Sequence, residues 1–377
     1  MRYLTRHVLE DLERKMVFIG GPRQVGKTTL AKALLKNSFP GGRYFNWDFD
    51  EDRRDILKKR WREDCPLLVF DEFHKYPYWK RWIKGVYDVL GERHRILVTG
   101  SARLDVYRRG GDSLLGRYHY WRLHPFSIDE RPKGMSASEA FKRLMTVGGF
   151  PEPFLDGDER AARRWRRERF ERIIREDIRD LEQIRNLQLL NLMVDLLRER
   201  VGSPLVLSNI AEDVQVSHKT VKSWLEVLER MYLVFIVRPL SKSVSRAVLK
   251  PPKAYFFDNG DVSGDEGARF ENFVASSLLK RLHFLEDSEG YRYELRYIRD
   301  KEGREVDFAI VKDGMVEELI EAKYGDENVS RSLRYYAERL RPRRAVQIVA
   351  RLRNGYDQNG ISVTTPEEYF SGKVAWA

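Results

Sequence analysis

The sequence predicts an α/β protein: a parallel sheet wrapped by helices, then a helical stretch, then a second α/β part. Three observations lead to this order. Short apolar runs alternate with helical patterns over about the first 130 residues, strand signals are absent between Ala137 and Val201, and alternating runs return after Pro251 and Pro252. Strands that alternate with helices favour a parallel sheet, because consecutive parallel strands need a crossover connection.

The individual elements follow from local patterns. Strands are expected at residues 15–20, 44–47, 66–70 and 95–100, with a helix over Leu30 to Leu35 after the first of them. Two short helices and a strand are expected over residues 207–237, and further strands at 253–258, 293–299, 305–311 and 317–324.

Composition excludes several classes of protein. The 377 residues include 69 Lys plus Arg and 58 Asp plus Glu, a net charge of +11. The longest apolar and aromatic run, residues 231–237, is far shorter than the roughly 18 residues of a membrane helix. The first residues lack the apolar segment of a signal peptide, and Cys65 has no second cysteine to pair with. We therefore expect a cytoplasmic protein, and its basic charge suits a polyanionic partner without proving one.

Two kinds of charged segment need separate interpretations. Residues 160–185 mix many arginines with acids at helical spacing, which favours a solvated helix with ion pairs over a DNA-binding face. Residues 242–253 contain four bases, no acid and two prolines, which is typical of a basic connector, and residues 339–344 form a second acid-free cluster.

Residues 21–28 read Gly-Pro-Arg-Gln-Val-Gly-Lys-Thr and satisfy the pattern G-x-x-x-x-G-K-[ST] between a strand and a helix. Glycines let backbone N–H groups surround phosphates at a helix N-terminus. Lys27 is expected to reach the β and γ phosphates, and the Thr28 hydroxyl to ligate Mg²⁺. The alternative is a chance glycine loop. The residues expected to contact a nucleotide are Gly21, Gln24, Val25, Gly26, Lys27, Thr28 and Thr29.

The second motif, Leu-Leu-Val-Phe followed by Asp71 and Glu72, delivers two carboxylates to the end of a buried strand. Ligands bind at that end of the strands in open α/β sheets. We expect Asp71 to hold the hydrated Mg²⁺ and Glu72 to orient the attacking water. The alternative is a pair of solvated acids.

Two further residues are predicted to assist hydrolysis. Ser101 follows the strand at 95–100 and would lie beside the γ-phosphate if that strand sits between the other two, although a helix N-cap is an equal alternative. Phosphoryl transfer also gains from an arginine, often from a neighbouring subunit. Arg108, Arg109 and Arg117 are candidates, and Arg117 is our choice.

The pattern of residues 207–237 is typical of a winged helix-turn-helix, with a turn at Val216 and Ser217. Polar residues gather at the start of the second helix, where such folds touch DNA. The alternative is a winged helix used only for protein packing. The predicted DNA contacts are Ser217, His218, Lys219, Thr220, Lys222 and Ser223.

Acids in the tail suggest a second site. Asp307 lies in one predicted strand, and Glu321 and Lys323 are two apart on the next, so they share a face. A hairpin could bring Asp307 beside them, and Glu271 on a predicted helix offers another acid. A carboxylate pair can hold Mg²⁺ while a lysine positions water for phosphodiester attack. The alternative is a charged hairpin with ordinary cross-strand pairs.

These motifs, with GGFPEPF at residues 148–154 and the tail segments ARFENF, EVDF and EAK, occur in one order. In that order the chain resembles archaeal and bacterial AAA+ ATPases that carry a C-terminal winged helix and a restriction-endonuclease-like tail. The resemblance implies a P-loop AAA+ core at 1–130, a helical lid at 131–200, a winged helix at 201–250 and an endonuclease-like domain at 251–377. The tail acids are similar to those of archaeal Holliday-junction resolvases.

The resemblance also implies a function. It suggests an ATP- and Mg²⁺-dependent protein that forms a ring or another oligomer, such as a hexamer, and acts on branched DNA in recombination or repair, with a nuclease site in its tail. Two alternatives stay open: a signalling switch in which ATP sets the oligomeric state, and a binding module whose tail has lost its chemistry.

Overall fold

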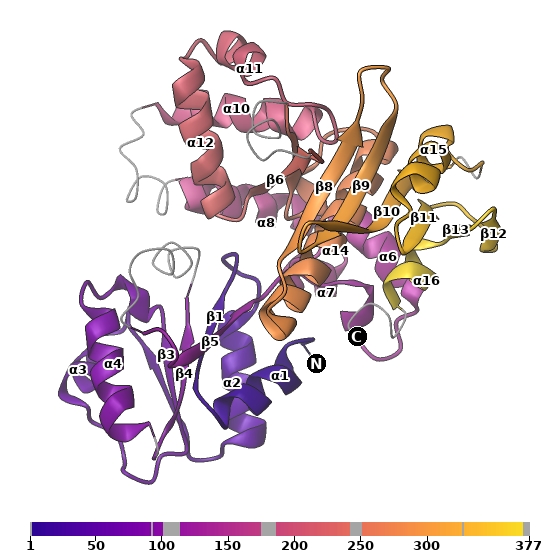
Figure 1. Cartoon of the computed structure of the whole chain (residues 1–377). Helices are drawn as coiled ribbons and strands as arrows, with labels where there is room; N and C mark the ends of the chain where they lie inside the picture. The colour runs from indigo at the N-terminus through magenta and orange to yellow at the C-terminus, as the bar shows by residue number, and fades with distance from the viewer. Residues whose placement is uncertain are drawn as a thin grey trace. The chain divides into compact units, whose positions relative to one another are not determined.

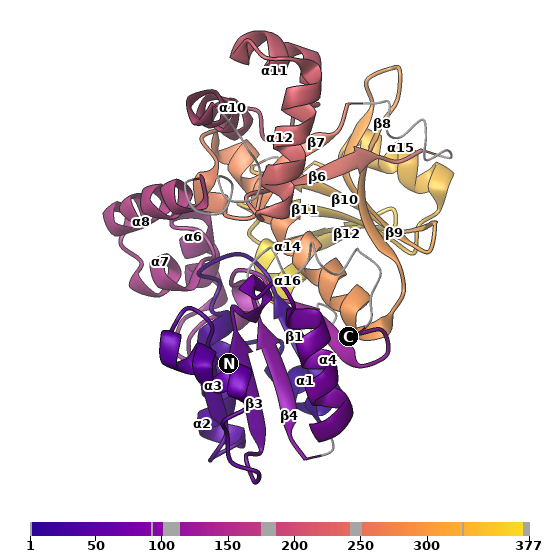
Figure 2. The same cartoon turned by 90° about the vertical axis from the view of Figure 1, so that its left-hand side faces the viewer.

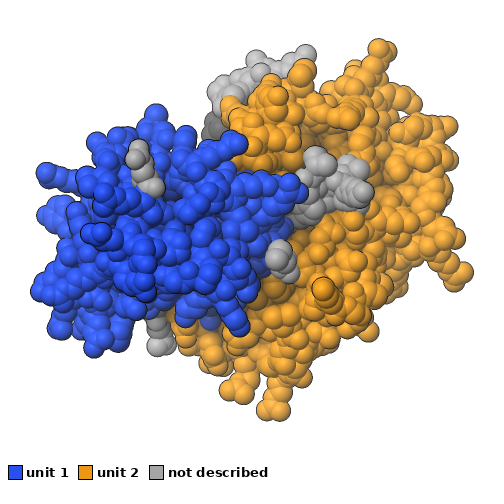
Figure 3. All heavy atoms as spheres, turned by 90° about the horizontal axis from the view of Figure 1, so that it is seen from below, with its two compact units in different colours: residues 1–124 blue, residues 125–377 orange. Residues whose placement is uncertain are grey.

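The structure is a computed structural model that describes residues 2–91, 93–100, 114–174, 186–241, 251–325 and 328–371. Contacts divide the chain into two compact units, residues 1–124 and residues 125–377, which Figure 3 shows in different colours. Each unit is described by itself. Among the described helices, none combines the length and apolar character needed to cross a bilayer.

The first unit contains a five-stranded parallel sheet. Its strands are β1 (Met16–Gly20), β2 (Arg43–Asn46), β3 (Leu67–Asp71), β4 (Arg95–Thr99) and β5 (Tyr118–Arg122), in the order β2-β3-β4-β1-β5. Every neighbouring pair is parallel. The four strands expected from the sequence are confirmed, and β5 was missed because Tyr-His-Tyr-Trp-Arg shows neither an apolar run nor clean alternation.

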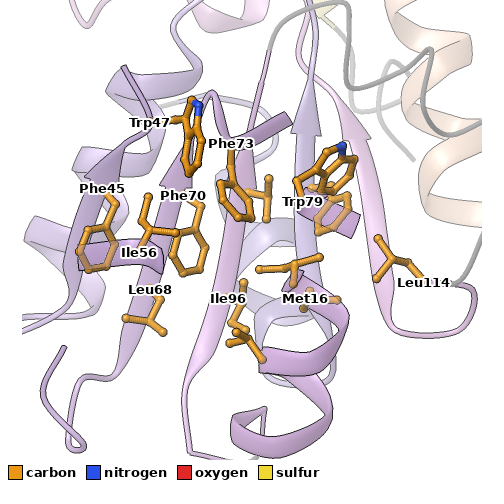
Figure 4. Packing of buried hydrophobic residues seen from close by; sticks show 14 of the residues in the cluster. Met16, Phe45, Trp47, Ile56, Leu68, Phe70, Phe73, Trp79, Ile96 and Leu114 are labelled. Atoms are coloured by element: carbon orange, nitrogen blue, oxygen red, sulfur yellow. The ribbon is translucent and has the colours of Figure 1, made fainter. Parts of the chain in front are cut away.

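Helices cover both faces of this sheet. They are α1 (Thr5–Leu12), α2 (Lys27–Ser38), α3 (Asp50–Lys58) and α4 (Trp79–Leu90). Figure 1 shows α1 and α2 on one face and α3 and α4 on the other. Figure 4 shows the core beneath α3 and α4, where Phe45 and Phe70 stack at 5.6 Å and Phe73 packs at 5.5 Å from Phe70. The parallel pairing of β2, β3 and β4 places their carboxyl ends at one edge of the sheet.

The second unit begins with helices. They are α6 (Ala137–Thr146), α7 (Pro151–Asp156), α8 (Glu159–Arg172), α10 (Leu187–Glu199), α11 (Leu207–Val214) and α12 (His218–Arg230). The ion pairs expected in the arginine-rich segment are present on α8, for example Arg167 with Glu171 at 3.2 Å. The prediction that this helix is solvated is wrong at Arg169. This residue is buried, pairs with Asp261 at 3.4 Å and stacks over Phe150.

A mixed sheet of eight strands completes the second unit. Its strands are β6 (Val234–Pro239), β7 (Lys253–Phe256), β8 (Tyr293–Arg299), β9 (Glu305–Lys312), β10 (Met315–Lys323), β11 (Arg344–Val349), β12 (Tyr356–Gln358) and β13 (Ile361–Thr364). Their order is β12-β13-β11-β10-β9-β8-β6-β7. The helices α14 (Glu266–Glu289), α15 (Arg331–Leu340) and α16 (Pro366–Ser371) accompany it (Figure 2).

The strand after α12 therefore belongs to the same sheet as the tail. β6 pairs antiparallel with β7 and parallel with β8. Residues on both sides of Pro251 and Pro252 share one sheet, so these prolines stand between paired strands. The basic segment 242–253 is only partly described, and its last residue is no connector residue, since Lys253 opens β7 and is 1% exposed.

Candidate functional site

The loop between β1 and α2 has the backbone that the phosphate-loop pattern requires. Gly21 and Gly26 have φ angles of 142° and 96°, and a Cβ on Gly21 would stand 2.3 Å from the Leu123 carbonyl oxygen. Gln24 is also left-handed, at φ 62°. Gly26 caps α2 and offers its first turn no side-chain acceptor. Backbone N–H groups at such a helix start suit an anion.

Lys27 lies inside this loop. Its side chain is buried, and its Nζ donates hydrogen bonds to the carbonyl oxygens of Gly21 at 2.9 Å and Pro22 at 2.7 Å. Val25 is buried, and its carbonyl accepts a hydrogen bond from Arg2 at 3.0 Å. Gln24 and Thr29 are exposed. The loop therefore encloses the ammonium group that is predicted to bind the phosphates of a nucleotide.

Asp71 at the end of β3 accepts hydrogen bonds from neutral hydroxyls. Thr28 donates to Oδ2 at 2.6 Å, Tyr44 donates to the same oxygen at 2.7 Å, and Thr99 donates to Oδ1 at 2.5 Å. Burial and the bond to Asp71 raise the pKa of Tyr44 well above its usual range. Among the described residues no Lys, Arg or His forms an ion pair with Asp71. The carboxylate is held in place while its negative charge stays unneutralised.

Tyr44 and Thr99 were not predicted as site residues. Both come from strands that flank β3 in the sheet, and Thr99 pairs in register with Asp71. Only the strand order, with β4 beside β3, brings their hydroxyls to this carboxylate.

Glu72 begins the turn out of β3. Its φ is 57°, and its backbone N–H donates to the Thr99 carbonyl at 2.9 Å. Its carboxylate lies 3.3 Å from the Lys75 ammonium and 3.8 Å from His74 Nε2. Lys75 also pairs with Asp48. The structure thus shows Glu72 engaged by the short helix η1 (Phe73–Lys75).

Of the remaining predicted residues of this unit, only Arg117 lies within the described part of the chain. Ser101, Arg108 and Arg109 fall outside the described residues, although β4 does lie between β1 and β3, as the Ser101 hypothesis requires. Arg117 precedes β5 and pairs with Asp88, Nε to Oδ1 at 2.7 Å. Since β5 runs parallel to β1 with Tyr118 beside Met16, Arg117 lies at the edge opposite this chain's phosphate loop.

The helix pair of the second unit has the expected start and exposure. α12 begins at His218, and the Ser217 Oγ caps it by accepting from the Thr220 N–H at 3.0 Å. Ser217, His218, Lys219, Lys222 and Ser223 are exposed, and Thr220 is half-buried. The opposite face of α12 is buried through Val221, Trp224, Leu225, Val227 and Leu228. DNA contact by the exposed start of α12 stays a prediction.

In the tail, the structure brings the predicted acids together. Asp307 on β9 accepts a hydrogen bond from the Ala322 N–H of β10 at 2.9 Å, and Lys323 pairs with Glu321 at 2.8 Å. Burial and the charge of Asp307 raise the pKa of Glu321 to about 7, against the opposing effect of Lys323. Burial and Asp307 likewise raise the pKa of Glu271, on α14, to about 7.

Three neighbours of these acids were missed: Lys253, Tyr255 and Glu305. The Lys253 ammonium lies 3.1 Å from Glu271 Oε1 and 2.6 Å from Glu305 Oε1. Burial would lower the pKa of Lys253, but the surrounding carboxylates raise it overall. We call Glu271, Glu305, Asp307 and Glu321 the acidic cluster. No local pattern marks Lys253, because its partners are distant in the sequence.

The two sites differ in their fit to a metal ion. Oxygen atoms of a hydroxyl and a carboxylate, as in Thr28 and Asp71, are the ligands that Mg²⁺ prefers, together with phosphate oxygens. The acidic cluster is already paired with lysine. In the part of the chain that the structure describes, no group of three or more His, Cys, Asp or Glu side chains is arranged to hold a metal ion.

Comparisons with known families agree with the first site. The family model described as "AAA domain" matches residues 13–131. The matched residues include the phosphate loop, Asp71 and Glu72. Two families described as "Domain of unknown function", DUF8612 and DUF4143, match residues 138–263 and 266–369. The winged-helix and endonuclease-like assignments stay proposals.

Relatives and solved structures are more distant. Uncharacterized proteins of Mycobacterium bovis and Mycobacterium tuberculosis are each 23% identical over 245 residues, which are 65% of this chain and 54% of theirs. The chain thus spans about half the length of these curated relatives. The Aeropyrum pernix ORC1 protein in complex with DNA is similar at a TM-score of 0.33 and 13% identity, covering 75% of this chain and 94% of that one. A Thermotoga maritima RuvB variant has a TM-score of 0.32 at 15% identity, covering 62% and 88%.

Proposed function

We propose that the chain hydrolyses ATP at the phosphate loop. The observation that carries the proposal is the 2.6 Å hydrogen bond from Thr28 to Asp71, which joins the first turn of α2 to the end of β3. Lys27 and the N–H groups at the start of α2 bind the phosphates, and Thr28 and Asp71 hold Mg²⁺. A bound Mg²⁺ neutralises charge on the phosphate oxygens.

Glu72 is the proposed water-orienting residue. Its carboxylate must then exchange the Lys75 contact for a water molecule when ATP is bound. Ser101 and an Arg117 side chain from another subunit are further proposed catalytic residues. The role of Arg117 requires its ion pair with Asp88 to break.

The role of Glu72 is tested by phosphate release from ATP. We expect Glu72→Gln to bind ATP as the wild type does and to hydrolyse it at least about 100-fold more slowly, since the amide is a poor base. Glu51→Gln, an exposed acid on α3, is the matched control. Unchanged hydrolysis in Glu72→Gln would remove this residue from the mechanism.

We further propose that the exposed start of α12 binds DNA and that binding stimulates hydrolysis. Lys219 and Lys222 are exposed on the same turn, beside a capped helix start that presents N–H groups to a phosphate backbone. An oligomer acting on branched DNA in recombination or repair is the physiological form of this proposal.

The DNA proposal is tested with labelled duplex and four-way junction. The double variant Lys219→Ala and Lys222→Ala is expected to weaken binding and to reduce its salt dependence by about two counter-ions. The double variant Lys133→Ala and Lys142→Ala, which removes two exposed lysines elsewhere in the unit, is the control. Equal loss in both pairs would indicate nonspecific attraction.

The tail admits two roles. One is a Mg²⁺-dependent nuclease that uses Glu271, Asp307, Glu321 and Lys323, and the other is a noncatalytic tail on a nucleotide-dependent switch or motor. The contacts of Lys253 favour the noncatalytic role. Cleavage of a four-way junction in Mg²⁺ that disappears in Asp307→Ala would support the nuclease instead. ATP-dependent strand separation that survives in this variant would support a motor.

A further inference from the structure

Lys253 enters the acidic cluster from β7. Its side chain is 1% exposed, and its Nζ lies 3.1 Å from Glu271 Oε1, 2.6 Å from Glu305 Oε1 and 3.9 Å from Asp307 Oδ1. An ammonium group has three donors and no acceptor. Its three neighbours here are carboxyl groups from α14 and β9, so one buried cation lies among three acidic side chains.

The same carboxylates have further partners. Tyr255 donates to Glu271 Oε1 at 2.6 Å, and Arg299 pairs with Glu305 Oε2 at 2.8 Å. The Ala322 N–H donates to Asp307 Oδ2. Each of the three acids therefore has a partner within the protein in addition to Lys253.

Backbone also closes over the cluster. Gly202, in the loop after α10, is so near that a Cβ added to it would stand 2.6 Å from Glu271 Oε2. This loop is tied to β7, because the Leu205 N–H donates to the carbonyl of Pro252 at 2.6 Å. Both oxygens of Glu271 thus face protein atoms.

A divalent cation could not share this arrangement. Mg²⁺ keeps several water molecules and demands near-octahedral oxygens at about 2.0–2.1 Å, and larger ions need still more ligands. The oxygens of Glu271, Glu305 and Asp307 instead surround an ammonium group, which has the same sign of charge as the metal ion. A cation beside Lys253 would meet repulsion in a medium of low polarity, where it is strongest.

We propose that Lys253 is the resident counter-ion of Glu271, Glu305 and Asp307 and stands where these three carboxylates would otherwise bind a divalent metal. The cluster is then a metal-free clamp that joins β7, β9 and α14 and carries no metal-dependent phosphodiester chemistry. The proposal is independent of the ATP site, and its test uses the full chain without nucleotide.

The test measures the binding of Mn²⁺ through the loss of the EPR signal of the free ion. Wild type and Asp307→Asn are expected to bind Mn²⁺ equally. Lys253→Met, which removes the ammonium and keeps most of the side-chain volume, is expected to gain a Mn²⁺ site and to lose it again when Asp307→Asn is added. The control is Lys280→Met, because Lys280 is likewise buried and paired with an acid, Glu130.

Thermal melting gives a second readout. Lys253→Met and Lys280→Met are both expected to melt below the wild type, and Mn²⁺ is expected to raise the melting temperature of Lys253→Met alone. The proposal is overturned if wild type binds a Mn²⁺ ion that Asp307→Asn loses. It is also overturned if Lys253→Met folds and gains no Mn²⁺ site. If Lys253→Met does not fold, the comparison of wild type with Asp307→Asn still decides the matter.

Discussion

The phosphate-loop site and the acidic cluster both place carboxylates near strands, but they compensate the charge differently. Asp71 is held by three hydroxyls, from Thr28, Tyr44 and Thr99. In the tail, Glu271, Glu305 and Asp307 surround Lys253. Neutral donors fix a carboxylate without neutralising it, whereas an ammonium group cancels charge. The first arrangement is prepared for an external cation, and the second already contains its own.

This difference shows why acidic residue type alone is a poor guide to metal chemistry. Asp307, Glu321 and Lys323 meet as the sequence predicted, yet Lys253, which the sequence did not reveal, also lies beside Asp307. A buried ion pair is costly to break because removing one partner leaves an unpaired charge. We therefore expect substitutions at the first site to change chemistry and substitutions at the second to change stability.

The largest expected effect is at Lys27. Lys27→Ala removes the ammonium enclosed by the phosphate loop, and we expect phosphate release to fall about 10²–10³-fold, as when a single charged donor to the reacting group is lost. A steady-state assay of phosphate release measures it. Lys36→Ala, an exposed lysine on the same helix, should retain full activity. Comparable activity in the two variants would place ATP elsewhere.

Matched substitutions of the two aspartates compare the sites directly. Asp71→Asn should reduce hydrolysis about 100-fold, because it removes the charge offered to the metal ion. Asp307→Asn should leave hydrolysis unchanged and lower the melting temperature, because Lys253 loses a carboxylate partner. Loss of ATP hydrolysis in Asp307→Asn would contradict the separation of the two sites.

The acidic cluster should make the stability of the chain depend on pH. The folded-state pKa of Glu321 is raised from 4.5 to about 7 by burial and by Asp307, with Lys323 opposing. Its neutral form is therefore favoured in the folded chain, and stability is lost as pH rises from about 4.5 through 7. Relative to wild type, Glu321→Gln should gain stability across this range, and urea unfolding at several pH values measures the difference.

A suitable control for that series is Glu338→Gln, an exposed glutamate on α15. Its stability should parallel the wild type at every pH. An equal slope in wild type and Glu321→Gln would mean that Glu321 ionises in the folded chain as it does in the unfolded one.

The smallest expected effects come from a pair of tyrosine hydroxyls. Tyr44→Phe removes one donor to Asp71 and should slow hydrolysis about fivefold, the value of a single hydrogen bond of about 1 kcal/mol. Tyr255→Phe removes one donor to Glu271 and should cost about 1 kcal/mol of unfolding free energy with no change in hydrolysis. Slower hydrolysis in Tyr255→Phe, or unchanged hydrolysis in Tyr44→Phe, would contradict this division between a chemical and a structural site.

The sequence predicted features that depend on local patterns. The four strands of the first sheet, the helix that begins after the phosphate loop, the start of α12 at His218 and the strands β9 and β10 are confirmed. Each shows strong periodicity or a turn signal within a few residues. The proximity of Asp307, Glu321 and Lys323 could be predicted because they lie on adjacent strands joined by a short turn.

Features that depend on distant pairing were not predicted. Tyr44 and Thr99 reach Asp71 only because β2 and β4 flank β3. Lys253 stands at the end of a basic segment that was expected to be a connector, and only the eight-stranded sheet carries it into the acidic cluster. Strand order and register over tens of residues are not encoded in any local motif, so these contacts required the structure.

The most direct test of the contrast between the sites is a count of Mn²⁺ ions bound with and without a nonhydrolysable ATP analogue. We expect Mn²⁺ to bind tightly only when the nucleotide is present, Asp71→Asn to abolish this binding, and Asp307→Asn to leave it intact. If Mn²⁺ bound tightly without nucleotide and Asp307→Asn removed that binding, the acidic cluster would be a metal site and the contrast between the two sites would be wrong.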